Sequence, residues 1–485
     1  MTPEPRDSTD QPDTARAPVN RNLLLAVLVS GAFVIILNQT LLNTALPVFM
    51  ADFGISASDA QWMTTIFMLV NGIMIPVTAF LIEKFTTRTM FLTAMMLFIV
   101  GTAVCALAPA YPVLLGGRVI QAASGGMIMP LMQTILFAIF PVRERGKAMG
   151  TFGLVIAFAP AIGPTLSGFI VDHWPWQSLF IMMLPIAVIA SVFGYFLLVN
   201  VTEQTNPRLD VVSVILSSLG FGGLLFGFGT AGDAGWVSPE VLIALAVGAV
   251  ALAFFIHRQL TLAEPLLELR VLRYPMFTLN TALGMIVFIA LIGGMLVLPL
   301  YMQNMTGFTA MESGMALLPG AVVMGVMSPI TGRIFDAVGA RWLAVIGFAL
   351  LTAATFPFTQ LTTETSFAYL AGFNAIRMLG AAMVMMPVTT AALNQLPKHL
   401  VPHGTAVNNT FRQIAASVGA AVLVTVMTST ALDPQVHGME GMVHGADMAF
   451  LVSMAVAALG IIGSFFITNS HGPDRTTQAS AGSDT

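Results

Sequence analysis

The strongest constraint on this chain is its succession of long apolar segments separated by short polar loops. A segment of about 20 apolar residues is long enough to cross the hydrocarbon core of a membrane as a helix. Hydrophobic residues make up 56% of the chain and charged residues only 9%, against about 25% charged residues in soluble domains. We therefore predict an all-α membrane protein. Its fourteen predicted spans lie near residues 23–45, 61–82, 90–108, 112–140, 147–170, 177–198, 211–230, 238–257, 275–302, 311–334, 341–360, 366–395, 404–431 and 446–468.

The Lys and Arg residues of the loops alternate from one loop to the next. Membrane proteins concentrate these residues on the cytoplasmic side. The odd-numbered loops contain no Lys or Arg, and a missed helix would scramble this alternation. The pattern therefore predicts fourteen helices with both termini in the cytoplasm. The even-numbered loops and the two tails contain Arg6, Arg16, Arg21, Lys84, Arg88, Arg143, Arg145, Lys147, Arg208, Arg258, Arg270, Arg273, Arg333, Arg341, Lys398 and Arg475.

The chain also contains an internal repeat. Glu83 corresponds to Asp336 (336 − 83 = 253), and Arg88 corresponds to Arg341 (341 − 88 = 253). Parallel repeats of this kind relate the two halves of some secondary transporters, which bind substrate between the halves. Three further pairs keep the same offset: Pro76 and Pro329, Gly54 and Gly307, and Asp59 and Glu312.

The repeat predicts two six-helix bundles with two helices inserted between them. The bundles occupy 23–198 and 275–468. A linker at 199–274 contains the inserted transmembrane helices, near 211–230 and 238–257. The polar ends of the chain, 1–22 and 469–485, are predicted to be disordered cytoplasmic tails.

The fifth span contains small residues on one helical face. Its residues 150–168 include glycines and alanines at spacings of three and four, which let a second helix approach closely in lipid. Pro160 and Pro164 each remove a backbone donor and bend the helix. We interpret this span as a gate, although a packing helix of any membrane protein could show the same stripe. The candidate gating residues here are Pro160, Gly163, Pro164 and Gly168.

The loop after the second span of each bundle shows a second gating pattern. A small residue is followed four positions later by an acid and then by an Arg. Such a carboxylate can pair with an Arg or with the N-terminus of a neighbouring helix, and so hold the cytoplasmic side shut. A solvated loop charge is the alternative. The residues are Glu83 and Arg88 in the first copy, and Gly332, Asp336, Gly339 and Arg341 in the second.

Three arginines lie inside predicted spans. A charged residue there costs about 2.5–3.5 kcal/mol on insertion scales, so it faces a cavity or a partner unless it reaches the membrane interface. We combine the arginines with nearby amide side chains into a predicted substrate and proton pathway. Its members are Asn38, Gln39, Asn43, Asn71, Arg118, Gln121, Gln303, Asn374, Arg377, Asn408 and Arg412.

We find no carboxylate deep within a span. Asp59 and Glu312, at helix ends, are candidate proton carriers. His403 lies beside a loop and is predicted to be solvated. The sequence shows no metal-ligand cluster, nucleotide-binding loop or nucleophile–base pair, so we expect neither an enzyme nor a cofactor. The net charge of −4 gives no indication of a nucleic-acid partner.

Four motifs together resemble those of a known family. Gly163-Pro164 to Gly168 resembles the antiporter signature of major facilitator superfamily (MFS) drug exporters. Residues 332–341 resemble the superfamily's loop signature, and Arg118 with Gln121 resembles its helix-four signature. LNQTLLNTALP at 37–47 resembles the helix-one signature of fourteen-helix drug:proton antiporters of the EmrB/QacA type, closest to the lincomycin-resistance exporters. Asn38 departs from that signature, which usually has an acid at this position. The departure matters because an amide cannot hold and release a proton.

The resemblance implies an MFS fold and a multidrug efflux transporter of the bacterial cytoplasmic membrane. It would export amphipathic drugs in exchange for protons by alternating access, with Arg118 taking part in proton coupling. The expected partners are small amphipathic substrates and the lipid bilayer, and a monomer is expected. Export or flipping of an endogenous lipid or metabolite remains an alternative. So does import, because architecture does not set direction. The lack of a deep acid favours neutral or zwitterionic cargo, or a cation recognised by aromatic rings.

Overall fold

The computed structural model describes residues 21–202, 204–468 and 470–471, and every regular element in them is helical. Fourteen helical segments are long and apolar enough to cross a membrane, which confirms the predicted fold class. Most of the two predicted disordered tails lies outside the described residues. The principal elements are α1 (Arg21–Phe53), α2 (Ala57–Lys84), α3 (Thr87–Ala106), α4 (Tyr111–Ile139), α5 (Arg145–His173), α6 (Ser178–Ile181), α7 (Met183–Leu197), α8 (Val211–Ala234), α9 (Pro239–Thr261), η2 (Leu269–Arg273), α10 (Pro275–Ile292), η3 (Gly293–Val297), α11 (Leu298–Asn304), α12 (Ala310–Val338), α13 (Ala340–Thr355), α14 (Phe367–Asn394), α15 (Val401–Thr430) and α16 (Pro434–Ser464).

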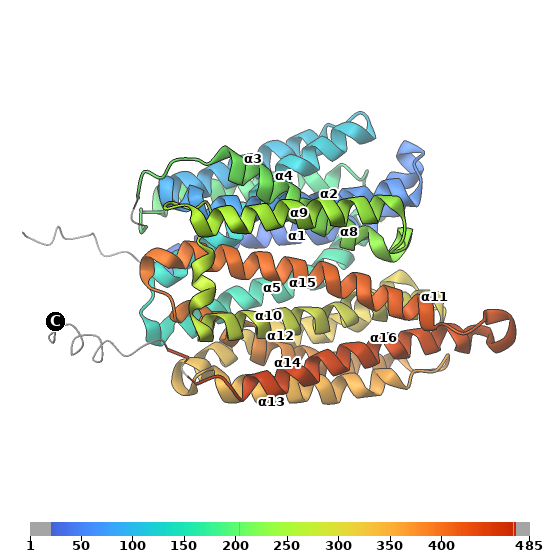
Figure 1. Cartoon of the computed structure of the whole chain (residues 1–485). Helices are drawn as coiled ribbons and strands as arrows, with labels where there is room; N and C mark the ends of the chain where they lie inside the picture. Colours follow the sequence, from blue (N-terminus) through green and yellow to red (C-terminus); the bar gives the residue numbers. More distant parts are fainter. Residues whose placement is uncertain (1–20, 203, 469, 472–485) are drawn as a thin grey trace, which may run out of the picture.

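The helices run roughly parallel in two layers (Figure 1). We call α1–α7 the first half and α10–α16 the second half. The end where α2, α4 and α14 finish and where α5 and α15 begin carries Lys84, Arg143 and Lys398, and we call it the basic end. The sequence predicts that this end faces the cytoplasm.

The internal repeat is visible in the backbone and in its hydrogen bonds. Gly54 and Gly307 both adopt positive φ, at 62° and 75°, where a side chain would be strained. A capping box then starts the next helix in each copy, with Asp59 in one and Glu312 in the other. Thr78 donates to the Gly126 carbonyl in the first half, and its counterpart Thr331 (331 − 78 = 253) donates to the Ala382 carbonyl, both at 3.1 Å.

The two halves meet most extensively along α5 and α12, where glycines replace side chains. A Cβ atom added at Gly146 would overlap the Gly332 carbonyl, and one added at Gly150 would overlap the Ser328 carbonyl. The small-residue face predicted for the fifth span therefore packs backbone to backbone against the other half. Gly168, at the far end of this face, has no heavy atom within 4 Å of such a Cβ.

The inserted pair, α8 and α9, is attached at one side of this assembly and is drawn in green in Figure 1. Helix α8 contacts both α2 and α15, and therefore both halves. Phe226 of α8 stacks on Trp62 of α2, with ring centroids 5.6 Å apart. Trp236 donates to Thr425 Oγ1 of α15 at 2.6 Å. Helix α9 packs against α8. Because α8 contacts one helix of each half, it fills the groove between the two halves on this side.

Candidate functional site

Arg118 is at the centre of a buried polar network in the first half. Its side chain is 1% exposed, which excludes the interpretation that it reaches the membrane interface. Nη1 donates to Asn38 Oδ1 at 3.0 Å and to Gln121 Oε1 at 2.9 Å. The guanidinium also stacks on Phe67, 4.3 Å from the ring centroid. Three of the predicted pathway residues, Asn38, Arg118 and Gln121, therefore lie together.

Arg377 is in a corresponding network in the second half and is 0% exposed. Its Nε donates to Thr355 Oγ1 at 2.9 Å, and its Nη2 donates to the Ala290 carbonyl at 3.0 Å. Thr355 is the repeat counterpart of Thr102 (355 − 102 = 253), which accepts from Gln121 Nε2 at 2.7 Å. The offset of 253 was the signal by which this pair of threonines could have been found in the sequence.

A break in the ninth span allows Arg377 to approach. The π-helical turn η3 interrupts the helix just after Ala290, and π-turns are frequent at functional sites. A Cβ atom on Gly294 would overlap Arg377 Nη1. Nη1 has no hydrogen-bond partner in the described part of the chain, and neither does either polar atom of Asn374. Asn374 and Arg377, both predicted pathway residues, are thus neighbours with unused hydrogen-bonding capacity.

Arg412 of α15 is the third intramembrane arginine, and it is 6% exposed. Its guanidinium stacks on Phe288 of α10, 4.2 Å from the ring centroid. Arg412 Nη1 and, one turn before it, Asn408 Nδ2 lack hydrogen-bond partners among the described residues. The ion pairs of the described chain join Arg258 to Asp210, Arg270 to Glu268 and His403 to Glu83. None of them involves an intramembrane arginine.

Polar side chains connect the halves between these arginines and the basic end. Asn409 Nδ2 donates to Gln133 Oε1 of α4 at 2.8 Å. The hydroxyls of Thr134 and Thr405 lie 3.2 Å apart. Arg145, at the start of α5, donates to Asn394 Oδ1 of α14 at 2.8 Å. We call this set of contacts between the halves the polar seam.

Asp336 closes the basic end by binding the N-terminus of α5. Its Oδ1 accepts from the Gly146 N–H at 2.7 Å and its Oδ2 from the Lys147 N–H at 2.8 Å. A helix N-terminus presents unpaired N–H groups and partial positive charge, so a carboxylate is stabilised there. The structure therefore gives Asp336 a partner of the kind predicted for it.

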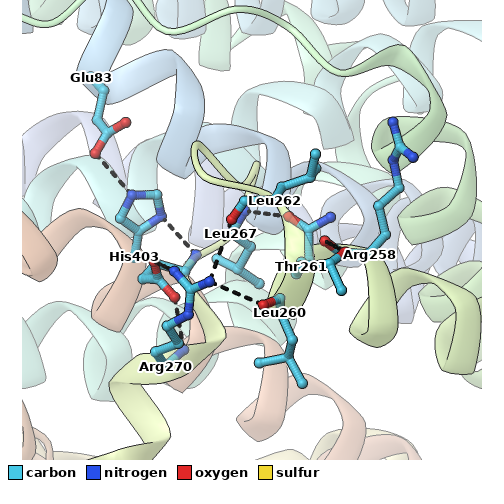
Figure 2. A network of polar contacts seen from close by, with 10 residues as sticks. Glu83, Arg258, Leu260, Thr261, Leu262, Leu267, Arg270 and His403 are labelled. Carbon is cyan, nitrogen blue, oxygen red and sulfur yellow. Dashed lines mark hydrogen bonds and ion pairs between the residues drawn. The ribbon is translucent and has the colours of Figure 1, made fainter.

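Glu83 closes the other side of the basic end through a histidine (Figure 2). Its Oε1 lies 2.8 Å from His403 Nε2 of α15, and the Glu268 N–H donates to His403 Nδ1 at 3.2 Å. His403 is 6% exposed, so the prediction that it is solvated is wrong. A position beside a loop suggested exposure, but the opposite half and the linker cover this residue.

The remaining motif residues have less direct roles. Arg88 stacks on Tyr195 at 4.4 Å and Arg341 lies 5.7 Å from the ring of Trp342, so neither holds the acid of its own motif by an ion pair among the described residues. Gly339 has a φ of 81° and packs against Ser470, where a side chain would be strained. Pro160 and Pro164 lie inside α5. Gly163 packs against Thr40 of α1.

Several predicted residues lie apart from the arginine networks. Gln303 is exposed at the end of α11, and Gln39 is half-buried on α1. Asn71 lies beside Gly125 of α4. The side chain of Asn43 is outside those that the structure describes. Asp59 and Glu312 each accept hydrogen bonds within the capping boxes of α2 and α12, so a structural role explains why they repeat.

Comparisons with known proteins agree with this geometry. Residues 28–420 match the family model described as Major Facilitator Superfamily. An uncharacterized MFS-type transporter of Bacillus subtilis (strain 168), YcnB, is 53% identical over 94% of this chain and 97% of the relative. Lincomycin resistance protein LmrB of the same organism is 42% identical over 92% of this chain and 95% of the relative. The solved structure of the MFS proton:xylose symporter XylE covers 95% of this chain and 98% of its own, with a TM-score of 0.65 and 12% identity, which shows a shared fold.

Proposed function

Because this chain belongs to the major facilitator superfamily, as a multi-pass transporter of a bacterial membrane, we propose that it exports drugs. Its cargo would be lincosamide-like and other hydrophobic, amphipathic antibiotics, leaving by alternating access in exchange for protons. The similarity to a protein named for lincomycin resistance supports the drug class. We place the protein in the cytoplasmic membrane as a monomer, with the basic end inside.

The observation that carries this proposal is the polar seam with its two closures at the basic end. Asp336 on the α5 N-terminus and Glu83 on His403 join the halves on opposite sides of the assembly. Both are polar contacts, which exchange with water at a modest net cost. The glycine contact of Gly146 with Gly332 needs no side chain to repack. A basic end held in this way can open and close, which alternating access requires.

The energy source in this proposal is the proton gradient, and no other cofactor is needed. Asp59 and Glu312 remain candidate carriers, although both serve in capping boxes. Glu83 and Asp336 are the carboxylates whose surroundings must change when the basic end opens. We therefore propose that proton uptake and release occur at these rim acids, with the buried arginines supplying a fixed positive field.

Everted membrane vesicles from a bacterium lacking its other drug pumps provide the test. Respiration acidifies their lumen, and addition of an exported drug should discharge part of the pH gradient when the protein is present. Vesicles with the empty vector should show no discharge. If the protein gives resistance but no exported drug releases protons at any pH tested, export occurs without proton antiport.

A lipid flippase would need an opening toward the bilayer between the halves. On the α2 and α15 side, α8 fills that position. Along α5 and α12, the backbones are in contact. Both features favour an amphipathic drug over a membrane lipid as cargo, and measured flipping of a labelled lipid by the purified protein would reverse this assignment.

A further inference from the structure

Three buried N–H donors near the polar seam have no acceptor. They are Arg412 Nη1, Asn408 Nδ2 and Gln133 Nε2, each without a hydrogen-bond partner among the described residues. Their side chains are 6%, 1% and 0% exposed. Buried donors without partners are rare in folded proteins, and each one calls for an explanation. Asn408 and Arg412 lie on α15, and Gln133 lies on α4, which packs against α15 across the two halves.

Two of the three donors, Asn408 and Arg412, lie on one face of α15. Asn408 and Arg412 are one turn apart on α15, so both point toward the same neighbour, α10. Asn409, the next residue after Asn408, is bonded to Gln133 of α4. Arg412 is eleven residues beyond Val401, which starts α15, or about 16 Å from the basic end at 1.5 Å per residue. This is near the middle of a hydrocarbon core about 30 Å thick.

Helix α10 leaves room beside these donors. At Gly284, a Cβ atom would meet only Asn408 Oδ1 within 4 Å, at 3.9 Å. Most glycines inside the other helix contacts would overlap a neighbour instead, as Gly146 does. One turn further along α10, the ring of Phe288 covers the face of the Arg412 guanidinium. The site therefore combines donors, a positive charge, an open glycine position and an aromatic wall.

We propose that Arg412 and Asn408 bind an anionic group of the exported amphiphile: a carboxylate, sulfonate or phosphate. A guanidinium has only donors and is always charged, and it binds such oxyanions with two parallel hydrogen bonds. No carboxylate of the described chain pairs with Arg412. The cargo supplies the missing acceptor and the missing charge. This inference rests on the function proposed above and adds anionic and zwitterionic amphiphiles to the hydrophobic antibiotics proposed as cargo.

Two matched pairs of probes test the charge requirement: cholate against methyl cholate, and laurate against methyl laurate. Binding is measured by calorimetry on the full chain in nanodiscs of phosphatidylcholine, which has no net charge. The acid of each pair should bind at least about tenfold more tightly than its ester, as expected for a charge-assisted hydrogen bond. Arg412→Gln should abolish this preference, and Arg412→Lys should keep most of it. Gly284→Leu should block binding while leaving the charge in place.

Arg273→Gln, which removes an exposed charge at the basic end, is the control and should bind as the wild type does. A wild type that binds acid and ester equally in both pairs overturns the inference, and so does an Arg412→Gln protein that is folded and still prefers the acids. Drug resistance conferred by the same wild type is measured in parallel. Resistance without charge preference contradicts only the anion site, whereas absence of resistance to every drug contradicts the proposed export function.

Discussion

Asn38 is the residue at which this chain departs from the helix-one signature that it resembles. The structure shows that the amide does part of what an acid would do, because its Oδ1 accepts from Arg118 at 3.0 Å. What the amide lacks is the negative charge that would neutralise the guanidinium. Arg118 is therefore held by neutral groups, and its positive charge remains available to act on other charges in the site.

Replacing Asn38 by Leu should destabilise the protein by about 1–3 kcal/mol, because a buried donor of Arg118 loses an acceptor. Asn38→Asp should preserve stability, since the carboxylate accepts the same hydrogen bond. Thermal unfolding in detergent measures both, with Gln303→Leu as a control at an exposed position. Equal melting temperatures for Asn38→Leu and wild type would show that Gln121 alone satisfies Arg118 Nη1.

Single residues differ in how far the sequence reveals their role. Arg118 and Arg377 could be predicted because a charge within an apolar span needs a reason to be there. His403 could not, because its burial depends on Glu83 and Glu268, which are 320 and 135 positions away along the chain. Sequence pattern reports local environment, whereas closure of the basic end is a property of how the halves meet.

At the scale of elements, the π-helical turn η3 interrupts the regular α-helix of the ninth span. Its glycines accommodate Arg377, whose guanidinium is fixed by Thr355 and the Ala290 carbonyl. The hydropathy of the apolar run 275–302 did not indicate this break, because it is uninterrupted. The local signs were the pair Gly293 and Gly294 and, just after the break, Pro299.

Gly294→Ala should therefore destabilise the protein by about 1–3 kcal/mol, as overpacking does elsewhere. A Cβ atom at position 294 would overlap the guanidinium of Arg377. Gly294→Ala should therefore destabilise an Arg377→Gln protein less than it destabilises the wild type. Thermal unfolding of the four proteins in this double-mutant cycle gives the coupling. Gly372→Ala on the neighbouring helix, where a Cβ meets nothing within 4 Å, serves as the control. If the two substitutions have additive effects on stability, the Arg377 side chain does not contact position 294.

The inserted helices α8 and α9 are joined to each other at the basic end by an ion pair. Arg258 donates to both carboxylate oxygens of Asp210, at 2.6 and 3.0 Å. These bonds lower the pKa of Asp210 from 3.8 to about 2. A carboxyl whose pKa is lowered by folding stabilises the folded state above its ordinary pKa, and this stabilisation is lost as pH falls toward the folded value.

Asp210→Asn should consequently lower the melting temperature at pH 7 and at pH 5 by similar amounts, and by less at pH 3, where the wild type begins to lose the same interaction. The measurement is a set of thermal scans of both proteins at these pH values. If the decrease in melting temperature caused by Asp210→Asn became larger at lower pH, the result would contradict the ion pair between Asp210 and Arg258.

At the scale of the whole molecule, fourteen helices and the repeat could be predicted because each span has its own hydropathy signal and each loop its own charge. Buried residues at equivalent positions in the two halves, such as Thr78 and Thr331, are even separated by the predicted offset and make equivalent hydrogen bonds. Which end is closed could not be predicted, because one sequence must be compatible with both closed and open forms if it transports. Opposing free-energy contributions nearly cancel between the closed and open forms, and no local sequence pattern shows which form is favoured.

The two closures of the basic end provide a last prediction, which concerns rigid-body motion. Asp336 binds α5, whereas Thr405 faces Thr134 near the other closure. If the halves move as units, both closures share one equilibrium, and weakening either shifts it. In a Cys105→Ser background, a cysteine replacing Thr405 should therefore react with a thiol reagent about tenfold faster in Asp336→Asn, which loses a charge-assisted hydrogen bond. Glu83→Gln should act similarly, and the double variant should multiply the two effects.

A cysteine replacing Ala148, a buried residue beside the Asp336 closure, distinguishes rigid-body motion from local loosening. Local fraying in Asp336→Asn would expose position 148 while leaving position 405 protected, because nothing would carry the change across the assembly. Rigid-body opening must expose both, because a hydrogen bond between Thr134 and Thr405 cannot survive separation of the helices that carry them. Faster labelling at position 148 alone would rule out a shared equilibrium and with it the rocking of two halves.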